Sequence, residues 1–265
     1  MSSDPLATAP TTSDRERQVL ALLKSLETGD PAPVALVNPD NYTQHNLAIG
    51  DGIEGLAAAL ELLDGTARVR SVRVFEDGDY VFVHTDYDFF GPKVGFDIFR
   101  FEDGRVVEHW DNLQETAGPN PSGRTMLDGP TMPTDLEKTN ENKTLVRTFF
   151  EDVLVGRRFD RLPDYFDGDR YIQHNPAIAD GLSGLGAALQ SWQEEGFEFA
   201  YDTVHAVFGE GNFVLVVSEG RFGGDPVAFY DLLRVENGKI AEHWDTIETI
   251  PPREAWQNDN GKFGF

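Results

Sequence analysis

The chain contains the stretch Asp103-Gly104-Arg105-Val106-Val107-Glu108-His109-Trp110-Asp111 and repeats it 134 residues later as Asn237-Gly238-Lys239-Ile240-Ala241-Glu242-His243-Trp244-Asp245. In each copy an Asp-Gly or Asn-Gly turn signal joins two apolar-rich runs, which predicts a β-hairpin. A second stretch, Tyr42-Thr43-Gln44-His45-Asn46, returns 129 residues later as Tyr171-Ile172-Gln173-His174-Asn175. A period near 130 residues is far longer than that of a solenoid or propeller repeat. The spacing therefore indicates that whole domains are duplicated.

Two domains of ordinary size fit within the 265 residues of the chain. We expect a mobile N-terminal tail at 1–12, a first domain at 13–116, a linker at 117–135, a second domain at 136–250 and a C-terminal tail at 251–265. The linker assignment rests on a proline- and glycine-rich composition without an apolar period.

Each domain is expected to begin with helices and to continue as an antiparallel meander, which is the α+β class. Ser13 is a candidate N-cap for a first helix that Gly29 ends, and 145–154 carries the corresponding apolar stripe in the second half. Short helices are expected after the two Gln-His-Asn segments, at 53–63 and 182–192. The alternating runs predict strands at 67–75, 80–90, 94–101, 105–114, 197–208, 213–221, 227–235 and 239–249.

The composition excludes several classes of partner and chemistry. The formal net charge is −24, and a protein so acidic is repelled by nucleic acid and by anionic membranes. The chain has no cysteine, which excludes disulfides and thiolate chemistry. We see neither a signal peptide nor an apolar run long enough to span a membrane, and we therefore expect a cytoplasmic protein.

The hairpin carries the candidate chemistry. Because side chains alternate along a strand, His109 and Asp111 share one face while Glu108 and Trp110 share the other. Carboxylates beside an imidazole suit proton transfer near neutral pH. The alternative is a hydrogen-bonded His–Asp pair that only stabilises a half-buried sheet, and duplication does not decide between the two, because copies inherit structural residues too.

The residue that faces His109 depends on the length of the hairpin loop. A three-residue loop with a glycine bulge pairs Asp97 with His109, whereas a two-residue loop pairs Ile98 with it. We favour the bulged register, because it lets Arg100 meet Glu108. The residues that it groups on the opposite face are Phe99, Val107, Asp97, His109 and Asp111.

The Gln-His-Asn segments allow two interpretations. As a strand, the first segment points Tyr42, Gln44 and Asn46 one way and His45 the other; as a turn, its polar groups cap the following helix. A metal site of His45, His109 and Asp111 is a further alternative, but the sequence contains no helical His-x-x-x-His pattern to support it, and we expect no metal.

A third polar group lies on the strand expected at 80–90. Tyr80, Phe82, His84, Asp86 and Asp88 share one face of that strand by alternation. The second copy has Val217 and Glu219 at the positions of His84 and Asp86, so its imidazole is lost. If His84 is functional, the two halves are not equivalent.

At these residues the chain resembles the SnoaL-like polyketide cyclase family of the NTF2-like superfamily. The matching pieces are the Tyr-x-Gln-His-Asn segment, the Asp-Gly that precedes the next helix, and the Asp-x-x-Arg and Gly-(Arg/Lys)-x-x-Glu-His-Trp-Asp elements of the hairpin. They cover both halves and leave out only the tails and the linker. The resemblance implies two cone-shaped α+β barrels, each a curved antiparallel sheet wrapped by helices around an apolar pocket. Since single-domain relatives often dimerise through their sheets, the chain would be an intramolecular pseudo-dimer, and a further homodimer stays open.

The resemblance also implies a reaction without a cofactor, in which a pocket Asp/His pair acts as acid and base on a small apolar carbonyl compound. An aldol-type cyclase, a lyase and an isomerase all fit this description. The alternatives are a ligand-binding or scaffold protein and an epoxide hydrolase. The candidate catalytic residues are His45, Asp97, His109, Asp111, His84, His174, Asp231, His243 and Asp245. The candidate substrate-binding residues are Tyr42, Gln44, Phe82, Asp86, Phe99, Tyr171 and Gln173.

Overall fold

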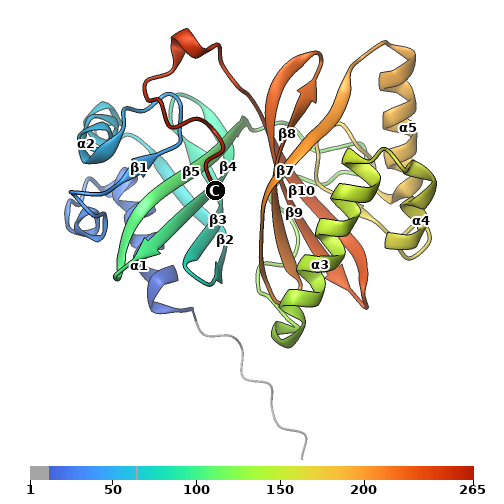
Figure 1. Ribbon diagram of the computed structural model, residues 1–265, viewed down its shortest axis with the longest axis horizontal. Coiled ribbons are helices and arrows are strands. Elements are labelled where there is room, and N and C mark those ends of the chain that lie inside the picture. Colours follow the sequence, from blue (N-terminus) through green and yellow to red (C-terminus); the bar gives the residue numbers. More distant parts are fainter. Residues whose placement is uncertain (1–11, 64) are drawn as a thin grey trace, which may run out of the picture.

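A computed structural model describes residues 12–63 and 65–265, so the tail expected at 1–12 lies almost wholly outside the described residues. Two five-stranded sheets pack against each other in the middle of the molecule, and helices cover their outer faces (Figure 1). This is the expected α+β arrangement of two domains, each a five-stranded sheet covered by helices. Within the described residues, no helix is long and apolar enough to cross a membrane.

The first domain follows the predicted order of helices and strands. Its elements are α1 (Asp14–Thr28), η1 (Ala32–Leu36), β1 (Thr43–Gln44), α2 (Gly52–Leu63), β2 (Arg68–Asp77), β3 (Tyr80–Asp88), β4 (Pro92–Glu102) and β5 (Arg105–Glu115). The sheet order is β1-β5-β4-β3-β2, with β1 parallel to β5 and the long strands antiparallel. The register of the short parallel strand sets Gln44 beside His109.

The second domain repeats this arrangement with the order β6-β10-β9-β8-β7. Its helical elements are η2 (Leu136–Lys138), α3 (Thr139–Phe149), the π-helical turn η3 (Phe150–Val155), η4 (Phe159–Arg161), α4 (Leu162–Tyr165), α5 (Gly181–Glu194) and η5 (Arg253–Ala255). Its strands are β6 (Ile172–Gln173), β7 (Phe199–Glu210), β8 (Phe213–Phe222), β9 (Asp225–Glu236) and β10 (Lys239–Thr249).

The ends of α1 confirm the capping prediction. The Ser13 hydroxyl accepts from the backbone of Glu16, and the Glu16 carboxylate accepts from the backbone of Ser13, which is a capping box. Gly29 ends the helix in the left-handed conformation with a φ of 67°. The buried face of α1, which includes Val19 and Leu23, packs on the sheet and positions the wall of the pocket.

The register of the β4–β5 hairpin corrects our expectation. The turn has two residues, Asp103 and Gly104, both with positive φ, and the bulge lies in β5 beside the turn. The extra residue therefore shifts the ladder in the strand and not in the loop, so Phe99 faces His109, and Asp97 faces Asp111. The expected meeting of Arg100 with Glu108 is confirmed.

The inner faces of the two sheets form one shared core. Phe82, Phe96 and Trp110 of the first sheet pack with Phe213 and Trp244 of the second. Both faces of each sheet are therefore buried, one against the partner domain and the other beneath its own helices. In each domain a cavity lies between the sheet and its own helices.

The segments that follow the last strand of each sheet cross to the other domain. We name residues 117–128, which follow β5, the first arm, and residues 251–265, which follow β10, the second arm. The first arm lies on the second domain, where Asn120 bonds to the carbonyl of Gln173. The second arm, red in Figure 1, crosses to the first domain, where Asn258 bonds to the carbonyl of Asn46.

Candidate active site

The first domain holds a cavity of about 460 Å³, which we name the first cavity. It lies between α1, α2 and the concave face of the sheet, and most of its wall is apolar. The apolar wall includes Leu22, Leu26, Ile49, Leu56, Leu60, Phe99 and Leu113. Two other lining residues, Leu62 and Phe90, are strongly exposed, which places them at its opening.

Three ionisable side chains meet in the wall of the first cavity. Asp97 comes from β4, and His109 and Asp111 come from β5; all three are buried and line the cavity. One side-chain atom of each lies within 4.8 Å of the others. The structure thus brings together the Asp–His–Asp group that alternation along the strands predicted.

The ring of His109 is held at both nitrogens. Its Nδ1 lies 3.0 Å from the side-chain oxygen of Gln44, and its Nε2 lies 3.3 Å from Asp97 Oδ1. The same Gln44 oxygen also accepts from the backbone of Asn46, which identifies it as the amide oxygen. Because an amide oxygen only accepts, Nδ1 must carry a proton. The second proton is then shared between Nε2 and Asp97.

The surroundings of Asp97 favour this sharing. Burial raises the pKa of Asp97, and the hydrogen bond to His109 opposes that rise. The hydroxyl of Tyr87 donates to Asp97 Oδ2 at 2.7 Å and fixes the carboxyl group. The hydrogen bond between Asp97 and His109 therefore gives the pair a path along which a proton can move.

Asp111 offers a free carboxylate oxygen. Asn46 Nδ2 donates to its Oδ2 at 2.6 Å, whereas no hydrogen-bond donor in the described part of the chain reaches its Oδ1. The nearest charged partner of Oδ1 is the ammonium of Lys262, 3.7 Å away. A buried acceptor without a donor is costly, and such groups are typical of sites that await a ligand or a proton.

Tyr42 places a neutral hydroxyl in the same wall. Its oxygen accepts from Gln44 Nε2 at 3.2 Å, which leaves its own hydrogen available to a ligand. Burial raises the pKa of Tyr42, and the charge of Asp111 raises it further. The hydroxyl therefore stays protonated and can donate to an oxygen in the cavity.

The second domain repeats the polar group with the same partners. His243 bonds to Gln173 at 2.8 Å and to Asp231 at 2.9 Å, and Asn175 bonds to Asp245 at 2.6 Å. Burial raises the pKa of Asp245 to about 6, although the charge of His243 opposes it. Burial lowers the pKa of His243, but the hydrogen bond to Asp231 and the negative charges of Asp245 and Asp231 together outweigh burial and leave the pKa raised.

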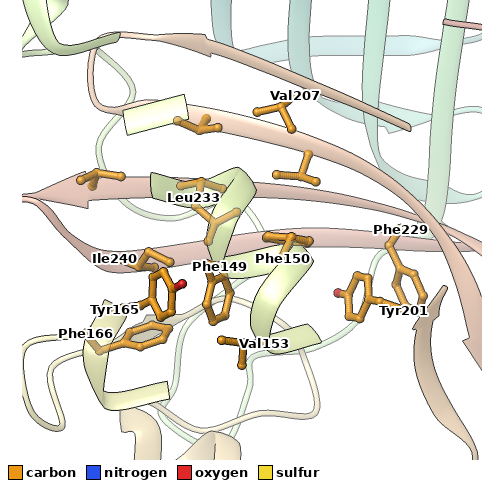
Figure 2. Packing of buried hydrophobic residues seen from close by; sticks show 14 of the residues in the cluster. Phe149, Phe150, Val153, Tyr165, Phe166, Tyr201, Val207, Phe229, Leu233 and Ile240 are labelled. Carbon is orange, nitrogen blue, oxygen red and sulfur yellow. The ribbon is translucent and has the colours of Figure 1, made fainter. Parts of the chain in front are cut away.

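The space beside this group is nevertheless closed. The corresponding second cavity has a volume of only about 60 Å³. Figure 2 shows Phe149, Phe150 and Tyr201 between the helices and the sheet of the second domain, where they belong to its hydrophobic core. The two halves therefore share their polar residues but not their space.

The structure does not bring His45 and His174 into the cavities. His45 stacks on Trp110 with ring centroids 4.7 Å apart and bonds to Glu108 at 2.9 Å, on the side of β5 that faces away from the first cavity. His174 stacks on Trp244 in the same way. The alternation that directs Gln44 and Asn46 into the pocket turns the histidine outward, so we assign neither histidine a catalytic role.

Three candidate residues on β3 also lie outside the first cavity. His84 stacks on Phe96 and lies 2.9 Å from Arg73, and Phe82 belongs to the core between the domains. Asp86 pairs with an arginine at the surface. These assignments are corrected, because Phe82 and His84 face the partner domain and Asp86 lies at the surface, whereas Tyr87 faces the pocket.

A metal site built from His45, His109 and Asp111 is excluded by the same geometry, because His45 lies on the opposite face of the sheet. Asp97, His109 and Asp111 could offer three ligand atoms to a cation. The ammonium of Lys262 beside Asp111 would repel that cation.

Sequence reasoning missed four residues around the first cavity: Tyr87, Asn46, Glu248 and Lys262. Glu248 belongs to β10 of the second domain and lines the first cavity, and Lys262 belongs to the second arm. A signal for Lys262 was present, since Asn120-Pro121-Ser122-Gly123-Arg124 returns as Asn258-Asp259-Asn260-Gly261-Lys262.

Each half of the molecule thus carries an Asp–His–Asp group on its sheet, beneath its helices. The family model for the SnoaL-like domain matches the sequence twice, over residues 19–109 and 146–243. The chain belongs to this family, as a tandem duplication. No curated protein matches the chain.

Among solved structures, the chain is similar to TsrD from Streptomyces laurentii, with 21% identity, 38% of this chain and 87% of that chain covered, and a TM-score of 0.34. It is also similar to an LEH-like epoxide hydrolase from M. tuberculosis, with 23% identity, 40% of this chain and 86% of that chain covered, and a TM-score of 0.33. A third similar structure is an NTF2-like protein of unknown function from Cytophaga hutchinsonii, with 19% identity, 41% of this chain and 95% of that chain covered, and a TM-score of 0.33.

Proposed function

We propose that the first domain is a cofactor-independent acid/base catalyst that removes a proton α to the carbonyl of a small apolar compound. An aldol-type cyclase, a lyase and an isomerase share this step. The observation that carries the proposal is the unbonded Oδ1 of Asp111, buried in the wall of an apolar cavity of about 460 Å³. A carboxylate oxygen without a hydrogen-bond donor, in the wall of a cavity, can accept a proton from a ligand bound there.

The remaining groups supply the other half of the reaction. As Asp111 takes the proton, negative charge develops on the carbonyl oxygen, and a neutral donor must stabilise it. Tyr42 carries such a hydroxyl in the same wall. The pair of Asp97 and His109 then returns a proton to the product carbon or oxygen.

The residues that line the first cavity support an apolar substrate. Leucine and phenylalanine side chains dominate the wall, and the exposed Leu62 and Phe90 continue this apolar surface to the opening. Exposed large apolar side chains around an opening are typical of binding sites for apolar ligands.

The second domain supports a different function. Its Asp231, His243 and Asp245 keep the hydrogen bonds of the first domain, but a cavity of about 60 Å³ leaves no room for a carbonyl compound. We assign it a scaffold role, on the observation that aromatic side chains fill the space.

The test uses exchange of the α-hydrogens of 2-tetralone, a two-ring ketone, in deuterated buffer, followed by proton NMR. We expect the protein to accelerate exchange and Asp111→Asn to reduce the rate by about a hundredfold or more. The matched control is Asp245→Asn, which changes the equivalent residue in the closed second domain and should leave the rate unchanged. Equal rates for wild type and Asp111→Asn, or for wild type and buffer, would falsify the assignment.

A further inference from the structure

The two arms hold the two domains by similar contacts. In the first arm, Asn120 Nδ2 donates to the carbonyl oxygens of Gln173 and Ile178, and its Oδ1 accepts from the backbone of Ser122. Gly123, the next residue, has a positive φ of 80° and turns the chain. The two bonds of Asn120 Nδ2 reach Gln173 and Ile178, which line the second cavity.

The second arm repeats this turn on the first domain. Asn258 Nδ2 donates to the carbonyl oxygens of Asn46 and Ile49, and its Oδ1 accepts from the backbone of Asn260. Gly261 has a φ of 78°. The halves therefore exchange equivalent arms, and a basic residue follows the glycine in each.

The two basic residues point in different directions. Arg124 of the first arm reaches outward and bonds to Asp180 at 2.8 and 3.0 Å, in a half-exposed pair. Lys262 of the second arm turns inward and is 5% exposed. Its Nζ lies 2.6 Å from Glu248 Oε2 and 3.7 Å from Asp111 Oδ1.

A difference in the second arm explains why Lys262 turns inward. Asp51 is the counterpart of Asp180, and Asn260 Nδ2 already bonds to it at 2.7 Å. The first arm has Ser122 in place of Asn260, and its hydroxyl bonds to the backbone of Asp180, so the carboxylate stays available for Arg124.

The strands provide the second difference. Where β5 and β10 meet, Gln114 accepts from the backbone of Ile247 at 2.9 Å, and Glu248 accepts from the backbone of Leu113 at 2.9 Å. These are equivalent contacts, but only Glu248 is charged. A buried ammonium needs such a carboxylate partner, because an unpaired charge in the interior is very unfavourable.

We propose that the second half of the chain completes the first cavity, with Lys262 as a positioning residue that holds the Asp111 carboxylate ionised and Glu248 as the residue that holds Lys262. Lys262 acts through Asp111 and does not touch the substrate. This inference rests on the proposed function for the role of Asp111 as the base, while the pairing of Lys262 with Asp111 stands independently of that role.

The charged groups around Asp111 set the expected pH dependence. Asp97 and His109 face it from the first sheet, Glu248 faces it from β10, and Lys262 is the cation from the second arm. Without Lys262, the negative charge of Glu248 would act on Asp111 with no ammonium to oppose it. Protons would then bind Asp111 at higher pH, and an acid cannot serve as the base.

The first experiment measures the exchange of 2-tetralone from pH 5 to pH 9 in wild type, Lys262→Met, Lys262→Arg and Arg124→Met. In Lys262→Met we expect the acid limb of the profile to move up by about one pH unit, so that the rate falls by up to about tenfold at the acid end of the profile and stays unchanged toward pH 9. Lys262→Arg should restore the profile, and Arg124→Met should keep that of wild type. An unshifted profile, or a loss of equal size at every pH, would overturn the positioning role.

The second experiment does not depend on activity and measures melting temperatures in a double-mutant cycle of Lys262→Met and Asp111→Asn. If the two groups interact, the double variant melts at a higher temperature than the sum of the two single shifts requires. The shifts of Arg124→Met and Asp111→Asn should simply add. Additive shifts for Lys262 and Asp111 would refute the pairing, whereas absence of exchange in wild type alone would refute only the proposed reaction.

Discussion

The side-chain oxygen of Gln44 lies 3.0 Å from Nδ1 of His109 and determines which proton that ring carries. We expect Gln44→Leu to slow the exchange of 2-tetralone by about tenfold to a hundredfold, because the ring is then free to change its tautomer and orientation. The buried donors left without a partner should cost about 1–3 kcal/mol of the free energy of unfolding. Exchange rates and urea denaturation check the two effects.

The matched control is Gln173→Leu, because Gln173 makes the same bond to His243 in the second domain. It should destabilise the protein by a similar amount without changing the exchange rate. If both substitutions slow exchange equally, the contribution of Gln44 is structural and the assignment to the first cavity is wrong.

The raised pKa of Asp245 predicts that the free energy of unfolding falls as the pH rises. Burial raises its pKa from 3.8 to about 6, so the folded protein binds a proton more tightly than the unfolded chain does. That stabilisation is complete below pH 4 and is lost between about pH 4 and pH 6. Asp245→Asn should therefore increase the free energy of unfolding by roughly 2 kcal/mol at pH 7 and change little at pH 4.

Thermal melting of wild type and Asp245→Asn across this pH range checks the prediction. Asn175 can still donate to the amide oxygen of the new side chain, so the geometry is preserved. A destabilised Asp245→Asn at pH 7 would mean that the ionised carboxylate stabilises the fold, which is opposite to the expected sign.

The hairpins and helix ends could be predicted from the sequence because local signals determine them. Ser13 and Gly29 mark α1, and the Asp-Gly and Asn-Gly turns mark the hairpins. Alternation then sets His109 and Asp111 on one face correctly. The cross-strand partner of His109 was missed, because nothing in the loop reveals a bulge located in the strand.

The faces of β3 could not be assigned in the same way. Val81 and Val83 pack beneath the helices, whereas Phe82 and His84 pack against the other domain, and all four are buried. When both faces of a strand are buried, apolar alternation no longer distinguishes pocket from interface. Lys262 was missed for another reason: its site is formed by two halves that the sequence presents as separate units.

The unequal cavities predict opposite effects of one substitution at two equivalent positions. Leu56 lines the first cavity and Leu185 lines the second. Leu56→Trp should fill the open space, abolish the exchange of 2-tetralone and change the free energy of unfolding by less than about 1.5 kcal/mol. Leu185→Trp has no space to occupy and should destabilise the protein by about 1–3 kcal/mol.

Chemical denaturation and exchange rates of the two variants distinguish these outcomes. A destabilised Leu56→Trp with a tolerated Leu185→Trp would show that the first cavity is closed in solution and that the second is open. Exchange that survives in Leu56→Trp would place the reaction elsewhere in the molecule.

Phe90 gives the last prediction, because it combines backbone strain with exposure at the opening of the first cavity. Its φ of 53° is unfavourable for a residue with a side chain, and the corresponding turn of the second domain uses Gly223 and Gly224. A large apolar side chain kept exposed in a strained conformation suggests a contact with the ligand. Phe90→Gly should therefore stabilise the protein by about 1 kcal/mol and weaken the binding of 2-tetralone. Asp103→Gly is the control, since Asp103 has a φ of 50° in a turn that does not line the first cavity, and its gain in stability should leave binding unchanged. Titrations followed by NMR measure the affinity, and equal affinities for wild type and Phe90→Gly would remove Phe90 from the binding site.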